Sequence, residues 1–323
     1  FIGLAVFSSD AMSSVAYAPQ EMLIVLVAAG TAGFAYSIPL AIAIVVLLTI
    51  LTLSYEQTIH AYPNGGGAYI VSRDNLGEIP ALVAASALLT DYILTVAVSI
   101  SSGVAQVVSA IPNLEPFRVT IAVGMVVFIT VINLRGIKES GSTFAIPSYF
   151  FVFMMVLTVV VGLFRFLILG SLGQVIDPPQ DLMRNLVQPI TIFLILKAFS
   201  SGTTALTGVE AISNGITAFK EPRSKNAGTT LIMMAFILGS LMLGITFLSH
   251  QIGVMPSEEE TVISQLARTV FDSRGVFYLA AIFSTMIILM LAANTAFAGF
   301  PWLAALTATD GYLPRQLTYR GSL

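Results

Sequence analysis

Three carboxylates and one ammonium group fall inside stretches of the sequence that are otherwise apolar or uncharged. Asp10 follows Ser8-Ser9, Asp91 lies in a run of aliphatic residues, Glu210 ends a run of small polar residues, and Lys197 is the fourth group. In a bilayer, each such charge would cost about 2.5–3.5 kcal/mol, so charges at this depth mark ion or substrate pathways by default. These acids therefore suggest the binding of a cation or a proton.

Hydroxyl groups accompany one of these acids. Asp91 opens the segment Asp91-Tyr92-Ile93-Leu94-Thr95-Val96-Ala97-Val98-Ser99. Tyr92, Thr95 and Ser99 are three and four residues apart and therefore lie on one face of a helix. A hydrogen bond between two packed helices is the alternative role for Asp91, because polar side chains also join helices in membranes.

The amino-acid composition indicates the class of protein that holds these groups. Of the 323 residues, 56% are hydrophobic and 10% are charged, whereas a soluble domain has about 25% charged residues. The mean hydropathy is +0.91, and the sequence has no cysteine. These values exclude a soluble enzyme, a nucleic-acid binder with a basic face, a disordered scaffold and a disulfide framework.

Eight stretches are long and apolar enough for transmembrane helices, each of which needs about 20 residues. They lie near 1–30, 37–61, 80–111, 118–134, 145–169, 186–218, 227–252 and 275–308. The runs do not alternate, which excludes a porin-like barrel. The sequence therefore predicts an all-α integral membrane protein. No signal peptide opens the chain and Phe1 already lies in an apolar run, so we expect a chain clipped at its start.

The first and sixth spans have polar centres. The first is interrupted by Ser8-Ser9-Asp10-Ala11-Met12-Ser13-Ser14, and the sixth by the glycine-containing segment 200–210. Broken helices at matching places in inverted repeats indicate a transporter's binding site. We expect unwinding near 8–14 and 200–208, with the two breaks facing each other across a central cavity. The alternative is that these hydroxyls only bond to helix carbonyls and pack helices.

Basic residues in the loops predict the orientation. With a cytoplasmic N-terminus, eight of them fall in inner loops and four in outer loops. The inner ones are Arg73, Arg135, Lys138, Lys220, Arg223, Lys225, Arg315 and Arg320, and the outer ones are Arg118, Arg184, Arg268 and Arg274. This bias favours a multi-pass protein of the cell membrane with its N-terminus in the cytoplasm.

The side chains at the breaks favour a cation over an anion. No glycine occurs between Ser8 and Ser14 to offer backbone amides to a carboxylate. Hydroxyls, freed carbonyls and carboxylates form an all-oxygen shell, which hard cations and potassium prefer. No His or Cys is present there for a soft metal. Carboxylates buried close together also hold protons more strongly, so one of them can carry a coupling proton.

Lys197 has two interpretations. It either pairs with an acid or extends to the outer membrane interface. If it pairs with Glu210, that acid is structural. If it does not, Glu210, three residues after Thr207, is the candidate for the coupling carboxylate.

Three motifs resemble those of the amino acid–polyamine–organocation superfamily. Tyr62-Pro63-Asn64-Gly65-Gly66-Gly67-Ala68-Tyr69 and Asn133-Leu134-Arg135-Gly136-Ile137-Lys138-Glu139-Ser140-Gly141 are similar to its connections between spans two and three and between spans four and five. Ser8-Ser9-Asp10-Ala11-Met12-Ser13-Ser14-Val15-Ala16-Tyr17 resembles the first helix of KimA-type potassium importers, relatives of the KUP/HAK/KT family. Amino acid transporters of the superfamily have a glycine-rich break there instead. The resemblance covers essentially the whole chain.

The resemblance implies a LeuT-like fold of 5+5 inverted repeats and proton-coupled import of potassium. The first repeat would be 1–170, with spans one to five, and 171–323 would hold spans six to eight of the second. The implied ligands of potassium and protons are Asp10, Tyr17, Asp91, Tyr92, Thr95, Ser99, Thr207 and Glu210. No cofactor beyond the transported ions is implied.

Compared with the family, the chain ends early, at Leu323. We therefore expect spans nine to twelve and any cytosolic regulatory domain to be absent. In this family such a domain can bind a cyclic dinucleotide that shuts transport, and function as a homodimer would depend on the absent segments.

Other functions stay open at this point. An amino acid or amine permease of the same architecture is the main alternative, since a cationic amine would also satisfy Asp10. A membrane sensor or a channel is a third, although the sequence has no Thr-Val-Gly-Tyr-Gly-like filter. It also has no recognisable nucleophile–base pair or phosphate loop, so it does not predict an enzyme.

Overall fold

The computed structural model describes residues 4, 9–63, 65, 67–135, 141–176, 188–257, 259–272 and 274–318. Within these residues every regular element is a helix. The long helices are α5 (Ser37–Ala61), α7 (Glu78–Ala110), α8 (Arg118–Leu134), α9 (Gly141–Leu169), α12 (Arg223–Ile252) and α14 (Val276–Thr309). The shorter helices are α2 (Ser9–Ser13), α3 (Ala18–Val27), α4 (Gly30–Phe34), α6 (Gly67–Leu76), α10 (Ile192–Gly202), α11 (Ala211–Asn214) and α13 (Val262–Val270). The 3-10 helices are η1 (Ser14–Ala16), η2 (Pro112–Phe117), η4 (Thr203–Leu206), η5 (Ile216–Ala218) and η6 (Arg315–Thr318).

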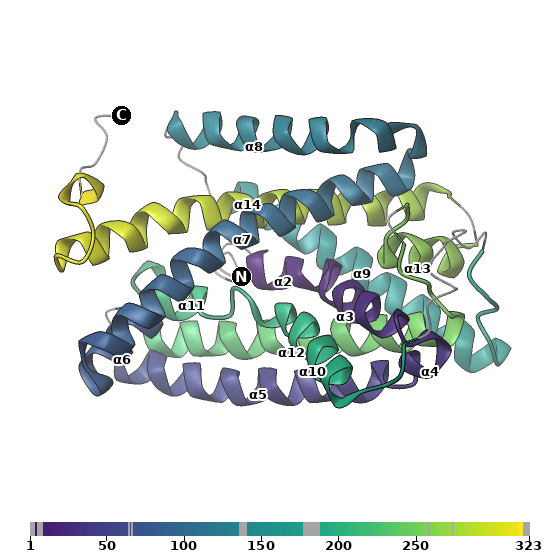
Figure 1. The fold of residues 1–323 in the computed structure, drawn as a ribbon, viewed down its shortest axis with the longest axis horizontal. Coiled ribbons are helices and arrows are strands. Elements are labelled where there is room, and N and C mark those ends of the chain that lie inside the picture. Colours follow the sequence, from purple (N-terminus) through teal and green to yellow (C-terminus); the bar gives the residue numbers. More distant parts are fainter. Residues whose placement is uncertain are drawn as a thin grey trace.

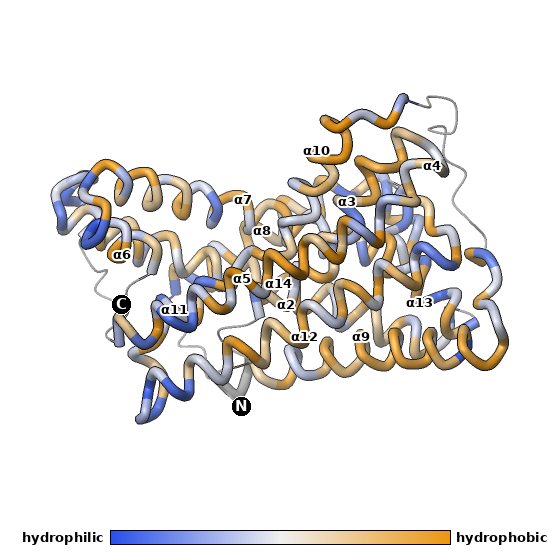
Figure 2. The backbone as a smooth tube through the Cα atoms, turned by 90° about the horizontal axis from the view of Figure 1, so that it is seen from below, coloured by the Kyte–Doolittle hydropathy of each residue, from blue (hydrophilic) through white to orange (hydrophobic). Residues whose placement is uncertain are grey.

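Seven segments of the described chain are long and apolar enough to cross a membrane. They run from Ala32–Ala61 to Val276–Thr309 and match the second to eighth predicted spans. Figure 2 shows the apolar middle of the molecule, with hydrophilic residues gathered mainly towards its two ends. The predicted all-α membrane protein is therefore confirmed. Parts of the first and sixth predicted spans and of the loop motifs lie outside the described residues, as do Lys138, Arg184 and Arg320.

Two pairs of long helices frame the molecule. Along one side α5 packs against α12, and on the other α7 crosses next to α14 (Figure 1). The short helices α2 and α3 lie between these pairs, where α2 contacts α14 and α3 contacts α10. The first and sixth predicted spans therefore meet in the interior, while α8 lies at the edge beside α7.

The outer helices present large apolar side chains to their surroundings. Val119, Val123 and Phe128 of α8 are all more than half exposed in the described structure. Apolar side chains on the outside of a membrane protein face lipid, which is as apolar as they are. Buried serines and threonines instead occur inside the bundle, and α2, η1 and α13 hold several of them, including Ser13, Ser14 and Ser264.

At one end of the bundle, α13 is fully buried and held by polar contacts. Its N-cap Thr261 accepts a hydrogen bond from the backbone amide of Ser264, which satisfies a free donor of the first turn. Glu260 and Arg268 form an ion pair at 2.8 Å, and little of either side chain is exposed. Each charge compensates the buried charge of the other, so removal of one partner alone would be strongly destabilising.

At the opposite end, α6 is attached to the end of α14. The Tyr69 hydroxyl donates a hydrogen bond of 2.7 Å to Asp310 Oδ2, and Arg73 pairs with the same oxygen. These contacts hold the pKa of the Asp310 carboxyl below its usual value, through the hydrogen bond from Tyr69 first and the Arg73 guanidinium second. The chain from α6 to α7 is therefore fixed against the last long helix.

Candidate functional site

The first broken helix tightens and then restarts beside a proline. After α2, residues 14–16 form the 3-10 turn η1, and Tyr17 has φ −122° and ψ −29° before α3 begins. The Ser13 and Ser14 hydroxyls donate to the carbonyls three residues earlier, at 2.7 and 2.6 Å. Pro19 lies in the first turn of α3 and has no amide hydrogen to give to the Val15 carbonyl, which favours a helix that starts here over one that continues from α2.

This break lies later than the sequence pattern predicts. Unwinding was expected over 8–14, but Ser9–Ser13 is α-helical, and Ser8 lies outside the described residues. Serine side chains that bond back to helix carbonyls are compatible with a helical turn, so the run of serines does not mark the break. Pro19 lies in the first turn of α3, where proline is tolerated, and is the better sequence signal for the point at which the helix restarts.

The second break extends from 203 to 210. The helix α10 continues to Gly202, η4 follows, Thr207 is extended with φ −63° and ψ 145°, and Gly208 has φ +78°. Ser200 and Ser201 are still helical, so the predicted limits of 200–208 are early by about three residues. The Thr203, Thr204 and Thr207 hydroxyls donate to carbonyls three residues earlier at 2.7, 2.8 and 3.0 Å. The positive φ of Gly208 is a conformation that glycine adopts at little cost.

The two breaks contact each other directly. Ser14 Oγ donates to the Ala205 carbonyl at 3.0 Å. The hydroxyls of Tyr17 and Thr207 are 3.2 Å apart, although the two residues are 190 positions apart in the sequence. The predicted meeting of the breaks is therefore confirmed. They meet through hydrogen bonds, and the central cavity expected between them stays a prediction.

Asp10 lies at the centre of this contact. It is only 6% exposed, and its Oδ1 atom is buried with no hydrogen-bond partner in the described structure. A Cβ atom added at Gly208 would lie 2.9 Å from Asp10 Oδ2, so the chain of the second break passes directly beside the carboxylate. The negative charges of Glu210 and Asp91 also act on Asp10. Carboxylates this close repel one another unless a cation or a proton lies among them.

The helix α7 supplies the remaining predicted residues. Thr95 and Ser99 are buried, and Ser99 Oγ has no hydrogen-bond partner among the described residues. Asp91 is half-buried, and its charge acts on both Asp10 and Glu210. Within the part of the chain that the structure describes, the Asp91 side chain forms no hydrogen bond with another helix, so its alternative role as a helix-to-helix bond is not supported.

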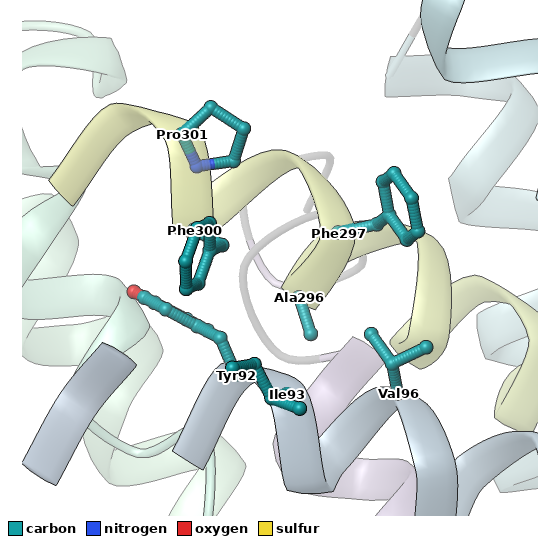
Figure 3. A pocket seen from close by; sticks show the side chains of 7 residues that line it. All are labelled: Tyr92, Ile93, Val96, Ala296, Phe297, Phe300 and Pro301. Atoms are coloured by element: carbon teal, nitrogen blue, oxygen red, sulfur yellow. The ribbon is translucent and has the colours of Figure 1, made fainter. Parts of the chain in front are cut away.

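Tyr92 links α7 to α14 and to the second break. Its ring packs so closely on α14 that a Cβ atom at Gly299 would lie 2.9 Å from ring carbons. Figure 3 shows the ring beside Phe300, with the hydroxyl directed away from Val96. This hydroxyl is within hydrogen-bonding reach of Asn214 at the end of α11. The groove in Figure 3, of about 250 Å³, is almost entirely apolar and offers few polar groups to an ion.

Two further polar residues belong to this neighbourhood and were missed from the sequence. Tyr55 of α5 is close enough for the charge of Glu210 to act on its hydroxyl. Asn214 reaches Tyr92, and its backbone carbonyl also lies 3.2 Å from where a Cβ atom of Gly65 would be. The signals available were a tyrosine within the second apolar span and an asparagine at the end of the interrupted sixth span.

Lys197 lies apart from these acids. It is exposed on α10 and forms no ion pair with any described residue. Of the two interpretations, extension to the interface is therefore favoured over a pair with Glu210. The Glu210 carboxylate therefore belongs to the cluster with Asp10, Asp91 and the tyrosines and is not paired with Lys197.

The close approach of Gly208 to Asp10 predicts an unequal effect of two alanine substitutions. Gly208 and Gly253 both have positive φ, but only Gly208 has atoms near the added Cβ, including the Ala11 amide nitrogen at 2.8 Å. We expect Gly253→Ala to cost about 1 kcal/mol of stability, and Gly208→Ala to cost clearly more. The melting temperatures of the two purified variants in detergent measure this difference. Equal losses would contradict the close contact between the two breaks.

Comparison with known proteins adds to this geometry. The chain is 51% identical over 319 residues to the potassium transporter KimA of Bacillus subtilis (strain 168), an alignment that covers 98% of this chain. It spans about half of that relative's length, 52%. The family model of the amino acid permeases matches residues 1–321. A match over nearly the entire sequence, together with apolar helices that can span a membrane, shows that the chain belongs to the amino acid permease family.

Proposed function

We propose that this chain belongs to the transmembrane region of a secondary active transporter that imports potassium ions together with protons across the cell membrane. The observation that carries the proposal is the Asp10 carboxylate, buried between two broken helices with one oxygen atom unpartnered. A buried anion of this kind is stable when a cation offsets its charge. The similarity to a protein named as a potassium transporter supports potassium as that cation.

The proposed ion site is formed by the eight predicted residues. Asp10, Asp91 and Glu210 supply carboxylates, and Tyr17, Tyr92, Thr95, Ser99 and Thr207 supply hydroxyls. Oxygen ligands of this kind replace the hydration shell of a potassium ion. The unpartnered Ser99 hydroxyl and the paired hydroxyls of Tyr17 and Thr207 support this assignment. Glu210 is the proposed coupling carboxylate.

We also infer a LeuT-like arrangement of inverted repeats, with the first repeat over 1–170, part of the second over 171–323, and a cytoplasmic N-terminus. The direct contact of the two broken helices supports the repeats, because such helices form the binding site at the repeat interface. The basic residues of the predicted inner loops support the orientation. A homodimer and regulation by a cyclic dinucleotide stay predictions about the full-length protein.

A second candidate function is the import of an amino acid or an organic amine. The family to which the chain belongs is that of the amino acid permeases. An ammonium group could pair with Asp10 as a potassium ion does. The carboxylate of an amino acid, however, would enter a site that already contains three acids, which favours the inorganic cation or a simple amine.

Growth of a potassium-uptake-deficient bacterium that produces the full-length protein tests the proposal. We expect the protein to restore growth at low potassium and to take up radioactive rubidium, a potassium analogue, faster when the outside is more acidic. A proton ionophore should remove this acceleration. Uptake of labelled amines or amino acids without rubidium uptake would instead establish the second candidate.

A further inference from the structure

A small polar cavity adjoins the proposed ion site on the side towards the C-terminal end of α7. Its volume is about 80 Å³, and its lining includes Tyr17, Gln20, Glu21, Ser101 and Gln106. One water molecule occupies about 30 Å³ in the liquid, so the cavity has room for an ion with a few waters. Tyr17 belongs both to this cavity and to the contact with Thr207, so the cavity and the ion site share a wall.

Oxygen atoms of fixed position line this cavity. The Gln20 and Gln106 side-chain oxygens accept hydrogen bonds from the Val262 amide at 3.1 Å and from the Thr261 hydroxyl at 2.9 Å. The Ser101 hydroxyl donates to the Val98 carbonyl at 3.0 Å. An amide or hydroxyl oxygen in such a bond keeps a free lone pair, which can face a cation.

Glu21 is the acid among these groups. Its side chain is half-buried and forms no hydrogen bond or ion pair with the described residues. Its charge acts on the Tyr17 hydroxyl, which places the carboxylate close to the wall of the ion site. The basic residue of the same cavity, Arg118, lies 3.9 Å from Glu115.

We propose that this cavity is an outer subsite for a monovalent cation that still carries water, at which Glu21 attracts the ion before it reaches Asp10. The inference rests on the proposed function, since it assumes that a cation moves through the Asp10 site. Passage then requires the contact of Tyr17 with Thr207 to open, because that contact lies between the subsite and the second break. The subsite gives Glu21 a role in the affinity for the ion and none in proton coupling.

Initial rates of rubidium uptake against rubidium concentration test the subsite in the full-length protein. We expect Glu21→Gln to raise the apparent KM about fivefold, the order of effect of one charge that acts through water over a few ångströms, with the maximal rate unchanged. Glu21→Asp should restore most of the affinity. Glu115→Gln is the matched control, since Glu115 is also an acid near Arg118, and its KM should stay at the wild-type value.

Two outcomes would overturn the subsite: an unchanged KM in Glu21→Gln, or an equal rise of KM in Glu115→Gln, which would indicate a general surface charge effect. Absence of rubidium uptake by the wild-type protein would instead refute the proposed function itself.

A binding measurement covers the case in which Glu21→Gln does not accumulate in the membrane. The 323 residues of this sequence include no cysteine, so a thiol at Ser102→Cys in the cavity can be labelled by a cationic thiol reagent, with the unsubstituted protein treated alike as the reference for labelling elsewhere. Potassium should slow this labelling, and labelling at the same rate with and without potassium would argue against the subsite.

Discussion

Replacement of Asp10 by asparagine is expected to reduce potassium uptake by about 100-fold or more, because opposite charges about 4 Å apart in protein surroundings attract by about 4 kcal/mol. The amide keeps the shape of the carboxylate and removes the charge that offsets the lost hydration of the ion. Asp10 has the least exposed carboxylate of the three in the site, so water compensates little for this loss. Rubidium uptake by cells that produce the variant measures the effect.

A matched control separates the charge of Asp10 from acidity in general. Asp74 is an exposed acid on α6, outside the apolar spans, and Asp74→Asn should leave uptake unchanged. The amount of each variant in the membrane must equal that of the wild type, which an immunoblot of the membrane fraction establishes. Near-normal uptake by Asp10→Asn at equal amounts would contradict the role that we propose for this carboxylate.

The helices could be predicted from sequence because hydropathy decides them. A run of about 20 apolar residues has few stable states other than a membrane-spanning helix, and seven of the eight predicted spans occur in the described chain as segments long and apolar enough to cross a membrane, the sixth of them broken as predicted. The one remaining span, which is the first in the sequence, was also correctly predicted to be broken. Its break was predicted too early, because serine hydroxyls that bond to helix carbonyls do not by themselves unwind a helix, and Pro19, in the first turn of the next helix, lies after them.

The site was harder to derive, because its parts are far apart along the chain. The acids could be found one at a time, since a charge in an apolar span is costly and therefore conspicuous. That Tyr17 touches Thr207 could be inferred only through the argument from two corresponding breaks. Tyr55 and Asn214 were not found, because a tyrosine or an asparagine at a span is common and its significance depends on which helix packs against it. The contact of Gly208 with Asp10 likewise depends on three-dimensional packing.

Replacement of Glu210 by glutamine is expected to remove the dependence of potassium uptake on the outside pH. Glu210 lies just after the positive-φ turn at Gly208 and precedes α11, and the charge of Asp91 acts on it. A carboxylate in this position can hold a proton when the ion site is empty and release it when a cation arrives. It can also bind the proton when the cation arrives and release it when the site is empty, and its distance from the ion decides between the two orders. Glutamine cannot exchange a proton, so the variant should either be silent or transport potassium without protons. Uptake at several outside pH values measures the loss of coupling.

Exchange experiments distinguish an uncoupled transporter from a damaged site. In membrane vesicles loaded with potassium, Glu210→Gln should still exchange internal potassium for external rubidium if only coupling is lost. Lys197→Met is the matched control, since Lys197 lies on the same broken span but is exposed and forms no ion pair with a described residue. It should keep the pH dependence of the wild type.

If instead both single variants lost folded protein and the double variant regained it, Glu210 would be a structural partner of Lys197. Intact uptake with unaltered pH dependence in Glu210→Gln would assign the coupling proton to another group, and Asp10 and Asp91 are the remaining acids of the site.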